Sequence, residues 1–390
     1  MGKPEIRFKG YTDEWEQRKL GDVAQEFKSG NSLKADEIDI TGDYPVYGGN
    51  GLRGYTSTYN HDGEYALIGR QGALCGNMNY SAGKAYFTEH AVVVKADENN
   101  VTRFLYYMLD TMNLGQYSDQ SAQPGLAVNK LVKLENSFPK KEEQQQIGAY
   151  FRSLDHLITL HQRKCDEVKS LKKYMLQKMF PQNEQKVPEI RFEGFTEAWE
   201  QRKLGDLVDR VTRKNQDLVS ELPLTISAQY GLIDQNEFFD KRVASKDVSG
   251  YYLIENGEFA YNKSTSTDAP WGAIKRLDRY KNGVLSTLYI VFGIKENNPV
   301  DSDFLVSYYN TNLWHKGIHE IAAEGARNHG LLNIAPADFF ETKLMIPQDI
   351  EEQKKIGKYF EELERLITLH QQKCEELKKI KKFMLQKMFV

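Results

Sequence analysis

The chain has 390 residues, of which 40% are hydrophobic and 12% aromatic, so it is long and apolar enough for roughly two or three folded domains rather than wholesale disorder. Its net charge of −3 excludes a small, strongly basic nucleic-acid-binding module, although a local basic surface is compatible with that total. No apolar run approaches the roughly 18 residues of a membrane span, and the three scattered cysteines cannot build a disulfide framework, so we expect a cytoplasmic protein.

The chain contains an internal repeat that is confined to parts of it. Residues 4–23 (PEIRFKGYTDEWEQRKLGDV) return from Pro188 as PEIRFEGFTEAWEQRKLGDL. The stretch EEQQQIGAYFRSLDHLITLHQRKCDEVKSLKKYMLQKMF, which ends at Phe180, returns as EEQKKIGKYFEELERLITLHQQKCEELKKIKKFMLQKMF, which ends at Phe389. The segments between these repeated parts hardly match, whereas drift after an ordinary tandem duplication would blur all parts alike. We interpret the chain as a shared frame around two inserts with different tasks.

Residues 1–138 predict a first domain of mixed α/β structure. Short apolar runs such as YALIG and HAVVVKA predict strands, and FLYYML from Phe104 predicts a helix. The glycine-rich segment YPVYGGNGLRGY lets the backbone approach a ligand closely, and Arg70 and Gln71 are residue types suited to guanine and adenine edges. For any one such residue a turn or structural role is the more common alternative. The candidate DNA-binding residues here are Asn50, Arg53, Tyr55, Arg70, Gln71, Asn77 and Asn79.

Residues 139–183 predict a long helix. Pro139 stands before it, where proline is tolerated, and Pro181 ends it. Its apolar residues alternate in steps of four and three, which is typical of a coiled-coil seam. The predicted seam residues are Phe151, Leu154, Ile158, His161, Cys165, Val168, Lys172, Met175 and Met179. Three further leucines are expected to widen the buried stripe, namely Leu157, Leu160 and Leu171.

Residues 184–346 predict a second domain of the same class with different loops. The run LYIVFGI predicts a strand, and FLVSYYN from Phe304 predicts a helix in a position that mirrors the helix from Phe104. The loops again carry donor-rich side chains. The candidate DNA-binding residues here are Gln229, Tyr230, Asn262, Lys263, Ser264, Thr265, Arg276, Arg327 and Asn328.

Residues 347–390 repeat the long helix and its seam. The nearest matching apolar face for either helix is the other copy, so we expect the two helices to pair antiparallel as a spacer between the domains. If the segment from Pro4 docks beside Phe389, it regains the neighbour that the segment from Pro188 has after the first helix. The seam residues are Ile356, Phe360, Leu363, Ile367, His370, Cys374, Leu377, Lys381, Met384 and Met388.

Two other interpretations of the helices stay open. A heptad seam is also typical of a coiled-coil stalk that joins several chains. The second interpretation is a zinc site, because His161 and Cys165, like His370 and Cys374, stand four residues apart and could meet in an antiparallel pair. Buried histidine and cysteine more often simply pack.

Signatures of catalysis are missing from both inserts. No Pro-Pro dipeptide occurs, so the motif that grips the target amine in amino-methyltransferases is absent. GNMNYSAGKA is not a phosphate-binding loop, because Ala85 replaces the Ser or Thr that holds Mg²⁺. We expect binding domains rather than a self-sufficient enzyme.

The repeated frame, with WEQRKLGD, YPVYGGNG…GRQGALCG, FAYNKS…WGAIKRL…STLYIVF and P-x-x-x-EQ-x-x-I-G-x-[YF]-F, resembles the specificity subunits of type I restriction–modification systems. The resemblance covers nearly the whole chain. It implies that each insert is a target recognition domain for one half of a split, asymmetric DNA site, and that the helices set the spacing of the half-sites. It also implies two methyltransferase subunits and, through them, two restriction–translocation subunits as partners. S-adenosylmethionine, ATP and Mg²⁺ are expected on those partners rather than on this chain.

Two functions of other classes compete with this one. A self-sufficient DNA-modifying enzyme would act on DNA without partners. A coiled-coil interaction scaffold would have no DNA specificity at all. The fold class expected in either case is mixed α/β, with two globular domains and a pair of long antiparallel helices arranged as a pseudo-twofold repeat.

Overall fold

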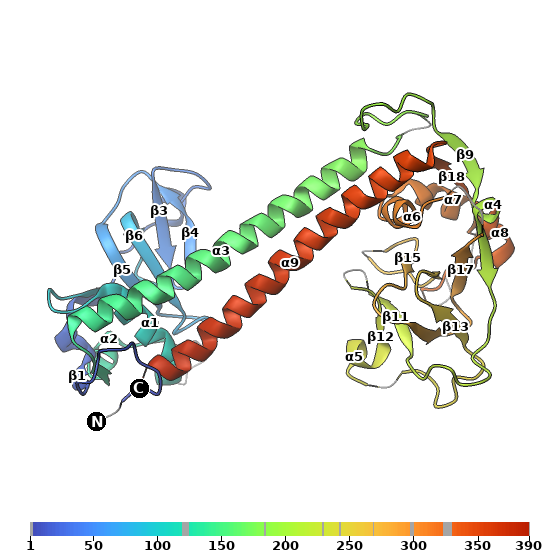
Figure 1. Cartoon of the computed structure of the whole chain (residues 1–390). Coiled ribbons are helices and arrows are strands. Elements are labelled where there is room, and N and C mark those ends of the chain that lie inside the picture. Colours follow the sequence, from blue (N-terminus) through green and yellow to red (C-terminus); the bar gives the residue numbers. More distant parts are fainter. Residues whose placement is uncertain are drawn as a thin grey trace. The chain divides into compact units, whose positions relative to one another are not determined.

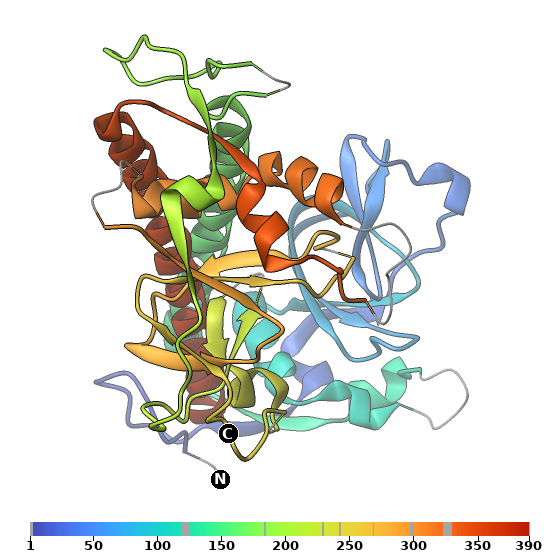
Figure 2. The same ribbon diagram turned by 90° about the vertical axis from the view of Figure 1, so that its right-hand side faces the viewer.

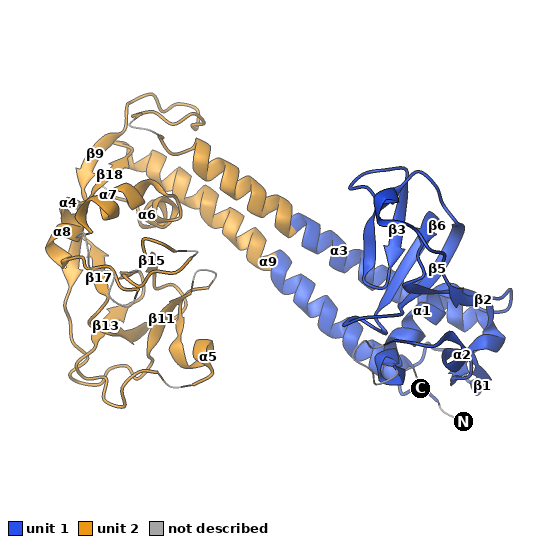
Figure 3. Cartoon of the chain, turned by 180° about the vertical axis from the view of Figure 1, so that it is seen from behind, with its two compact units in different colours: residues 1–164, 370–390 blue, residues 165–369 orange. Residues whose placement is uncertain are grey.

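A computed structural model describes residues 3–118, 125–182, 185–227, 230–241, 243–267, 269–296, 300–322 and 330–389 (Figure 1). The chain divides into two compact units, Met1–Lys164 with His370–Val390, and Cys165–Leu369 (Figure 3). Two long helices, α3 (Lys141–Lys178) and α9 (Ile350–Met388), each contribute to both units. One helix therefore lies within each of the predicted ranges 139–183 and 347–390. Within the described ranges, no helix is long and apolar enough to span a membrane.

The first unit is built on a six-stranded sheet with the order β2-β7-β5-β6-β3-β4. The core lies between the sheet and α1, and the predicted strands YALIG and HAVVVKA and the helix from Phe104 are confirmed by β5, β7 and α1. Its strands are β1 (Glu16–Lys19), β2 (Ala24–Ser29), β3 (Tyr44–Gly48), β4 (Gly51–Thr56), β5 (His61–Gly69), β6 (Met78–Phe87), β7 (Ala91–Ala96) and β8 (Glu135–Phe138). Its helices besides α3 are η1 (Leu20–Val23), η2 (Ala35–Glu37), α1 (Thr102–Thr111), η3 (Leu114–Tyr117) and α2 (Val128–Leu131).

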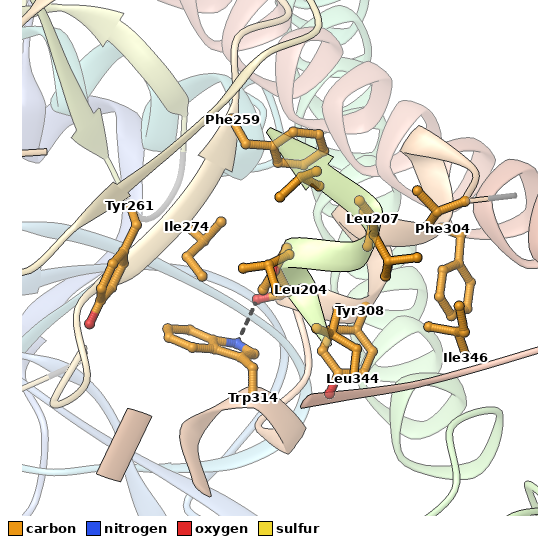
Figure 4. Close-up of a cluster of buried hydrophobic side chains, with 14 of the residues drawn as sticks. Leu204, Leu207, Phe259, Tyr261, Ile274, Phe304, Tyr308, Trp314, Leu344 and Ile346 are labelled. Atoms are coloured by element: carbon orange, nitrogen blue, oxygen red, sulfur yellow. Dashed lines mark hydrogen bonds between the residues drawn. The ribbon is translucent and has the colours of Figure 1, made fainter. Parts of the chain in front are cut away.

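In its described residues the second unit has a four-stranded sheet, β10-β17-β14-β15, and three separate strand pairs, β11-β12, β13-β16 and β9-β18. In Figure 4, Phe259 and Ile274 of the sheet gather with Phe304 of α6 and Trp314 of α7 in one buried cluster. Its strands are β9 (Glu200–Lys203), β10 (Val208–Val211), β11 (Leu224–Ser227), β12 (Gly231–Asp234), β13 (Tyr252–Glu255), β14 (Phe259–Asn262), β15 (Ala273–Arg276), β16 (Asn282–Leu285), β17 (Ile290–Ile294) and β18 (Lys343–Ile346). Its helices besides α9 are α4 (Leu204–Leu207), α5 (Gln235–Phe239), α6 (Ser302–Tyr309), α7 (Leu313–Ile321) and α8 (Pro336–Glu341).

The two units share one plan despite their dissimilar inserts. The strand order β2-β7-β5-β6 of the first sheet corresponds to β10-β17-β14-β15 of the second. The strand that opens each domain pairs with the strand that closes it, β1 with β8 and β9 with β18. The residue before each mirrored helix also bonds to the long helix that follows, because the Val101 N–H donates to Gln144 and the Asp301 N–H donates to Gln353. The predicted mixed α/β fold and the internal repeat are confirmed.

The long helices pair antiparallel within each unit, as the seam predicted. In the first unit, Lys381 Nζ lies 2.6 Å from Asp155 Oδ1, and the equivalent distance from Lys172 Nζ to Glu364 Oε2 in the second is also 2.6 Å. The seam side chains are mostly buried, and Phe389 packs against Phe104 in the same way as Phe180 packs against Phe304.

The expectation that further leucines widen the buried stripe is wrong for two of the three. Leu157 is 39% exposed and Leu171 is 44% exposed, whereas Leu160 is half-buried. The reason is geometric, because one antiparallel partner helix covers one seam and these leucines lie beside it.

The repeated N-terminal segments dock on the ends of the long helices. The Ile6 N–H donates to the Lys387 carbonyl at 2.9 Å, and the Ile190 N–H donates to the Lys178 carbonyl at the same distance. The first of these contacts brings the two ends of the described chain side by side (Figures 1 and 2). The prediction that both copies have the same neighbour is therefore confirmed.

A buried ion pair fixes each docked segment. The Arg7 guanidinium donates two hydrogen bonds of 2.7 Å to the Glu143 carboxylate. The Arg191 guanidinium does the same to Glu352, at 2.6 and 2.7 Å. Both glutamates lie in the first turn of a long helix, where the unpaired N–H groups also favour a negative charge.

Candidate nucleic-acid interface

In the first domain a two-residue turn, Gly49–Asn50, joins β3 to β4 and lies on the end of β5. The turn requires glycine at position 49 for lack of space and at position 51 for its backbone conformation. A Cβ at Gly49 would lie 2.9 Å from the carbonyl oxygen of His90, and Gly51 has a φ of +90°. Asn50 is exposed at the tip. Backbone and side-chain donors of this turn are therefore held next to the loop that follows β5.

That loop begins with Arg70 and Gln71 and is held by backbone bonds on both sides. The Arg70 N–H donates to the His90 carbonyl and the Arg70 carbonyl accepts from the Leu126 N–H, both at 2.9 Å. The Arg70 guanidinium donates to the Glu89 carbonyl at 3.3 Å. Gln71 is exposed, and its Oε1 lies 3.2 Å from Nδ1 of His90. The backbone is thus fixed while the side chains stay accessible.

The two asparagines that follow join the same cluster. The Asn77 carbonyl accepts from the Gly69 N–H at 2.8 Å, and the Asn77 side chain is exposed. Oδ1 of Asn79 lies 2.8 Å from where a Cβ of Gly51 would be, so the Asn79 side chain faces the β3–β4 turn. Five of the predicted residues therefore lie together, namely Asn50, Arg70, Gln71, Asn77 and Asn79.

The other two candidates of this domain lie along β4. Arg53 is exposed beside the turn. Tyr55 is farther down the strand and half-buried, and its backbone exchanges two 2.9 Å hydrogen bonds with Asp39. Tyr55 therefore has a structural role through its backbone, and a role in binding DNA stays a prediction.

The second domain places Lys263 where the first has Arg70. The Lys263 carbonyl accepts from the Leu332 N–H at 2.9 Å, just as the Arg70 carbonyl accepts from Leu126. The next residues also correspond, because Gln71 forms an isolated bridge with Gly125, and Ser264 forms one with Leu331. The two domains thus present different side chains from the same backbone site.

Hydrogen bonds hold the loop around Lys263 in place, and some of its side chains are exposed. Burial, and to a lesser extent the Arg210 charge, lower the pKa of Lys263, whose Nζ lies 3.4 Å from the Ile334 carbonyl. The Thr265 hydroxyl and N–H both donate to the Gly330 carbonyl, at 3.0 and 2.7 Å. Ser264 is exposed, and its N–H donates to Oδ1 of Asn262 at 3.0 Å, so Asn262 stabilises the turn.

Arg276 does not join this cluster, because it lies opposite Phe259, at the far end of β14 from Lys263. The Arg276 guanidinium is held within the domain by Asp278 at 2.6 Å and by Asp303 at 2.7 Å, and its pKa is raised although burial opposes this. Tyr230 is 56% exposed just before β12. Gln229, Arg327 and Asn328 lie outside the described residues.

Glu89 and His90 belong to the first cluster but were not among the sequence candidates. His90 begins the apolar run HAVVVKA, which predicts only a strand. Its place beside Arg70 follows from the pairing of β5 with β7, in which Gly69 is opposite Ala91. No local pattern in the sequence predicts how β5 and β7 are aligned.

The seam histidines and cysteines of the two long helices lie within hydrogen-bonding distance of other groups. Nδ1 of His161 lies 3.0 Å from Nδ1 of His370, and the Cys374 thiol lies 3.9 Å from the Ile158 carbonyl. In the second unit, the Cys165 thiol lies 3.9 Å from the Ile367 carbonyl. Among the residues described, no group of three or more His, Cys, Asp or Glu side chains is arranged to hold a metal ion. The zinc interpretation gains no support from this arrangement.

The chain is thus a protein of two repeated domains. At an equivalent backbone site, each domain carries a different set of polar side chains. The sequence matches the family of the type I restriction modification DNA specificity domain twice, over residues 12–170 and 196–379. The chain belongs to this family.

Two curated relatives are similar in sequence to part of this chain. The specificity subunit of the type I restriction enzyme EcoprrI from Escherichia coli is 42% identical over 156 residues, which are 39% of each chain. A putative type I restriction enzyme specificity subunit from Haemophilus influenzae, S.HindORF215P, is 27% identical over 150 residues, or 38% of each chain. These matches span about two-fifths of the length of either relative.

One solved structure shares the fold along the whole chain. The crystal structure of the S subunit of a type I restriction–modification system from M. genitalium has a TM-score of 0.71 to this chain. The comparison covers 100% of this chain and 99% of that one, at 15% sequence identity. It confirms the two-domain repeat with long helices.

Proposed function

We propose that this chain is the DNA-sequence-recognition subunit of a type I restriction–modification complex, in which each domain binds one half of a bipartite, asymmetric site. The observation that carries the proposal is the equivalence of two backbone sites with different side chains. Arg70 and Gln71 occupy one site, and Lys263 and Ser264 occupy the other. A repeated scaffold with unlike side chains at the same place is what two unlike half-sites require.

The side chains of the two clusters suit the edges of base pairs. Arginine and lysine donate to the O6 and N7 acceptors of guanine, glutamine suits adenine, and serine suits several bases. Rigid backbone beneath exposed side chains lowers the entropic cost of ordering them on DNA. The relatives, which are named as specificity subunits of type I restriction enzymes, support the same function.

In this proposal the chemistry takes place on partner subunits in the cytoplasm. Methyltransferase subunits bind S-adenosylmethionine, and restriction–translocation subunits bind ATP and Mg²⁺. This chain selects the site and holds those subunits over it, and it is not an enzyme by itself. The absence of methyltransferase and phosphate-binding motifs in the sequence supports this division.

The long helices offer an equivalent apolar patch in each unit for two copies of one partner. Leu171 and Tyr174 of α3 are 44% and 49% exposed, and their counterparts Ile380 and Phe383 of α9 are 37% and 50% exposed. Each pair lies one turn apart on a helix surface. Because the pattern is repeated, the two patches suit two copies of the same protein, which we propose are two methyltransferase subunits, with a restriction–translocation subunit bound to each.

The test is to map methylation in DNA from cells that express the chain with its partners. A bipartite motif with two unlike halves and methylated adenines is the expected result. A continuous motif, or none, contradicts the proposal. Purified chain that cuts or methylates DNA without partners would instead establish a self-sufficient enzyme, and a complex with no DNA preference would indicate a scaffold.

A further inference from the structure

A second turn lies beside the recognition loop at the same place in each domain. In the first domain this turn is Thr88–His90 and leads into β7, and the Ala91 N–H closes it on the Thr88 carbonyl at 3.0 Å. In the second it is Ser286–Leu288 and leads into β17, and the Tyr289 N–H closes it on the Ser286 carbonyl, also at 3.0 Å.

Strand register shows that His90 and Leu288 are equivalent. Ile68, two residues before Arg70, is opposite Val92 in the first sheet. Tyr261, two residues before Lys263, is opposite Ile290 in the second. His90 and Leu288 each stand two residues before that opposing residue. In the first domain the Arg70 N–H donates to the His90 carbonyl at 2.9 Å. In the second domain the same register, continued by two residues past the Tyr261–Ile290 pair, assigns Leu288 the corresponding place across from Lys263.

The two side chains offer opposite chemistry at this place. The Leu288 side chain is 56% exposed, and the Leu288 N–H donates to the neighbouring Ser286 hydroxyl at 3.4 Å. The His90 ring lies 3.2 Å from Oε1 of Gln71 on one side and 3.5 Å from Glu89 on the other. One turn thus presents an apolar surface, while the other holds a polar side chain of the recognition loop.

Given the proposed function, on which this step rests, we propose that the two turns determine one base pair in each half-site. Leu288 contacts the C5-methyl group of a thymine, because that methyl is the apolar feature of the major groove. His90 is a positioning residue. Its contact with one of the two acceptor sites of Gln71 Oε1 holds the amide in an orientation in which the amino group donates to guanine O6 or N7, whereas adenine needs the oxygen and the amino group together.

The Leu288 contact is tested with the assembled complex and duplexes in which each thymine of the second half-site is replaced, one at a time, by deoxyuridine, which lacks only the methyl. The wild type is expected to lose about fourfold in affinity at one position, the effect of burying one methyl-sized group. Leu288→Ala is expected to bind both duplexes equally at that position. Val219→Ala, which changes a 58% exposed apolar residue elsewhere in the domain, should keep the wild-type response.

The His90 effect is tested with guanine-to-adenine substitutions in the first half-site. His90→Ala is expected to reduce the preference for guanine at one position by about fivefold or more, because the freed Gln71 amide accepts adenine as well. Binding to variants of the second half-site should not change.

Three results overturn the inference in separable ways. The Leu288 contact is contradicted if no position of the second half-site is sensitive to deoxyuridine. It is also contradicted if the Leu288→Ala complex keeps this sensitivity. An unchanged guanine preference in His90→Ala removes the role of His90. A wild-type complex without a bipartite motif overturns both, together with the proposed function.

Discussion

Arg70 and Lys263 occupy one backbone site in two domains, so their effects on DNA binding should be separable. Arg70→Ala is expected to weaken binding by about 1–3 kcal/mol and to relax specificity only in the first half-site. Lys263→Ala should do so only in the second and serves as the matched variant. The measurement is the affinity of the assembled complex for duplexes mutated in one half-site. Unchanged affinity in either variant would show that the substituted residue does not contribute to DNA binding.

The buried pair between Arg191 and Glu352 should be a large determinant of stability. The Glu352 side chain is 1% exposed, so Arg191→Ala leaves a buried carboxylate without its bidentate partner, although the Trp199 indole N–H still donates to it at 3.4 Å. Removal of one partner of such a pair costs about 3–5 kcal/mol, measured by denaturant unfolding.

The control for that prediction is Arg365→Ala. Arg365 pairs with Glu362 on the exposed face of α9, with side chains 64% and 52% exposed. Little or no measurable loss of stability is expected there, because water and salt screen surface pairs. Similar losses in both variants would show that burial does not set the strength of the Arg191 pair.

At the scale of single elements, the His161 and His370 layer should make the helix pair sensitive to acid. Burial, followed by the charges of His370, Lys164 and Lys373, lowers the pKa of His161. The unfolded chain therefore binds a proton more readily than the folded chain, so the free energy of unfolding falls as the pH drops through the ordinary histidine pKa, near 6.5. Unfolding measured between pH 7.5 and 5.5 should show this loss.

Substitution of both histidines tests the origin of that slope. The double variant His161→Gln with His370→Gln keeps polar side chains in the layer but cannot take up a proton, so its stability should depend less on pH. His156→Gln, an exposed histidine on the same helix, should keep the wild-type slope. If the double variant shows the same slope as the wild type, the acid sensitivity lies elsewhere in the chain.

The exposed pairs on the long helices make a prediction about assembly. Ile380→Glu with Phe383→Glu should leave the chain folded, since both side chains are exposed, but should remove one of two methyltransferase copies from the complex. Leu171→Glu with Tyr174→Glu should remove the other copy. Native mass measurement of the complex checks both, with Gln372→Glu on the same helix as a control that keeps two copies. Two copies in every variant would place the docking site elsewhere.

At the scale of the whole molecule, the repeat predicts that half of the chain can replace the other half. Residues 171–180 (LKKYMLQKMF) differ from residues 380–389 (IKKFMLQKMF) at two positions, and the latter fill the first core beside Phe104 and Phe151. A chain of residues 1–187 should therefore form a dimer in which each copy supplies that helix end to the other.

This half-length dimer should read a symmetric site that consists of two copies of the first half-site. Light scattering gives the mass of the dimer, and methylation mapping with the partner subunits gives the site. A folded monomer would show that the first domain does not need the second helix, and an asymmetric motif would contradict the assignment of one half-site to each domain.

Sequence alone was enough for the frame, the two long helices and the division into two domains. These features are local or repeated, since a heptad seam and a duplicated segment can be seen without knowing what packs where. The mirrored helices from Phe104 and Phe304, and the docking of Ile6 beside the end of α9, also followed from the repeat and are confirmed.

Only the tertiary structure decided which residues share a site and which apolar residues are covered. The register of β5 with β7 places His90 beside Arg70, and the equivalent register in the second sheet, continued past the Tyr261–Ile290 pair, assigns Leu288 the corresponding place. It likewise took the structure to show that Arg276 is bound within its domain and that Leu157 and Leu171 stay exposed. Strand register and burial depend on partners distant in the sequence, and a residue's type and local spacing do not identify those partners.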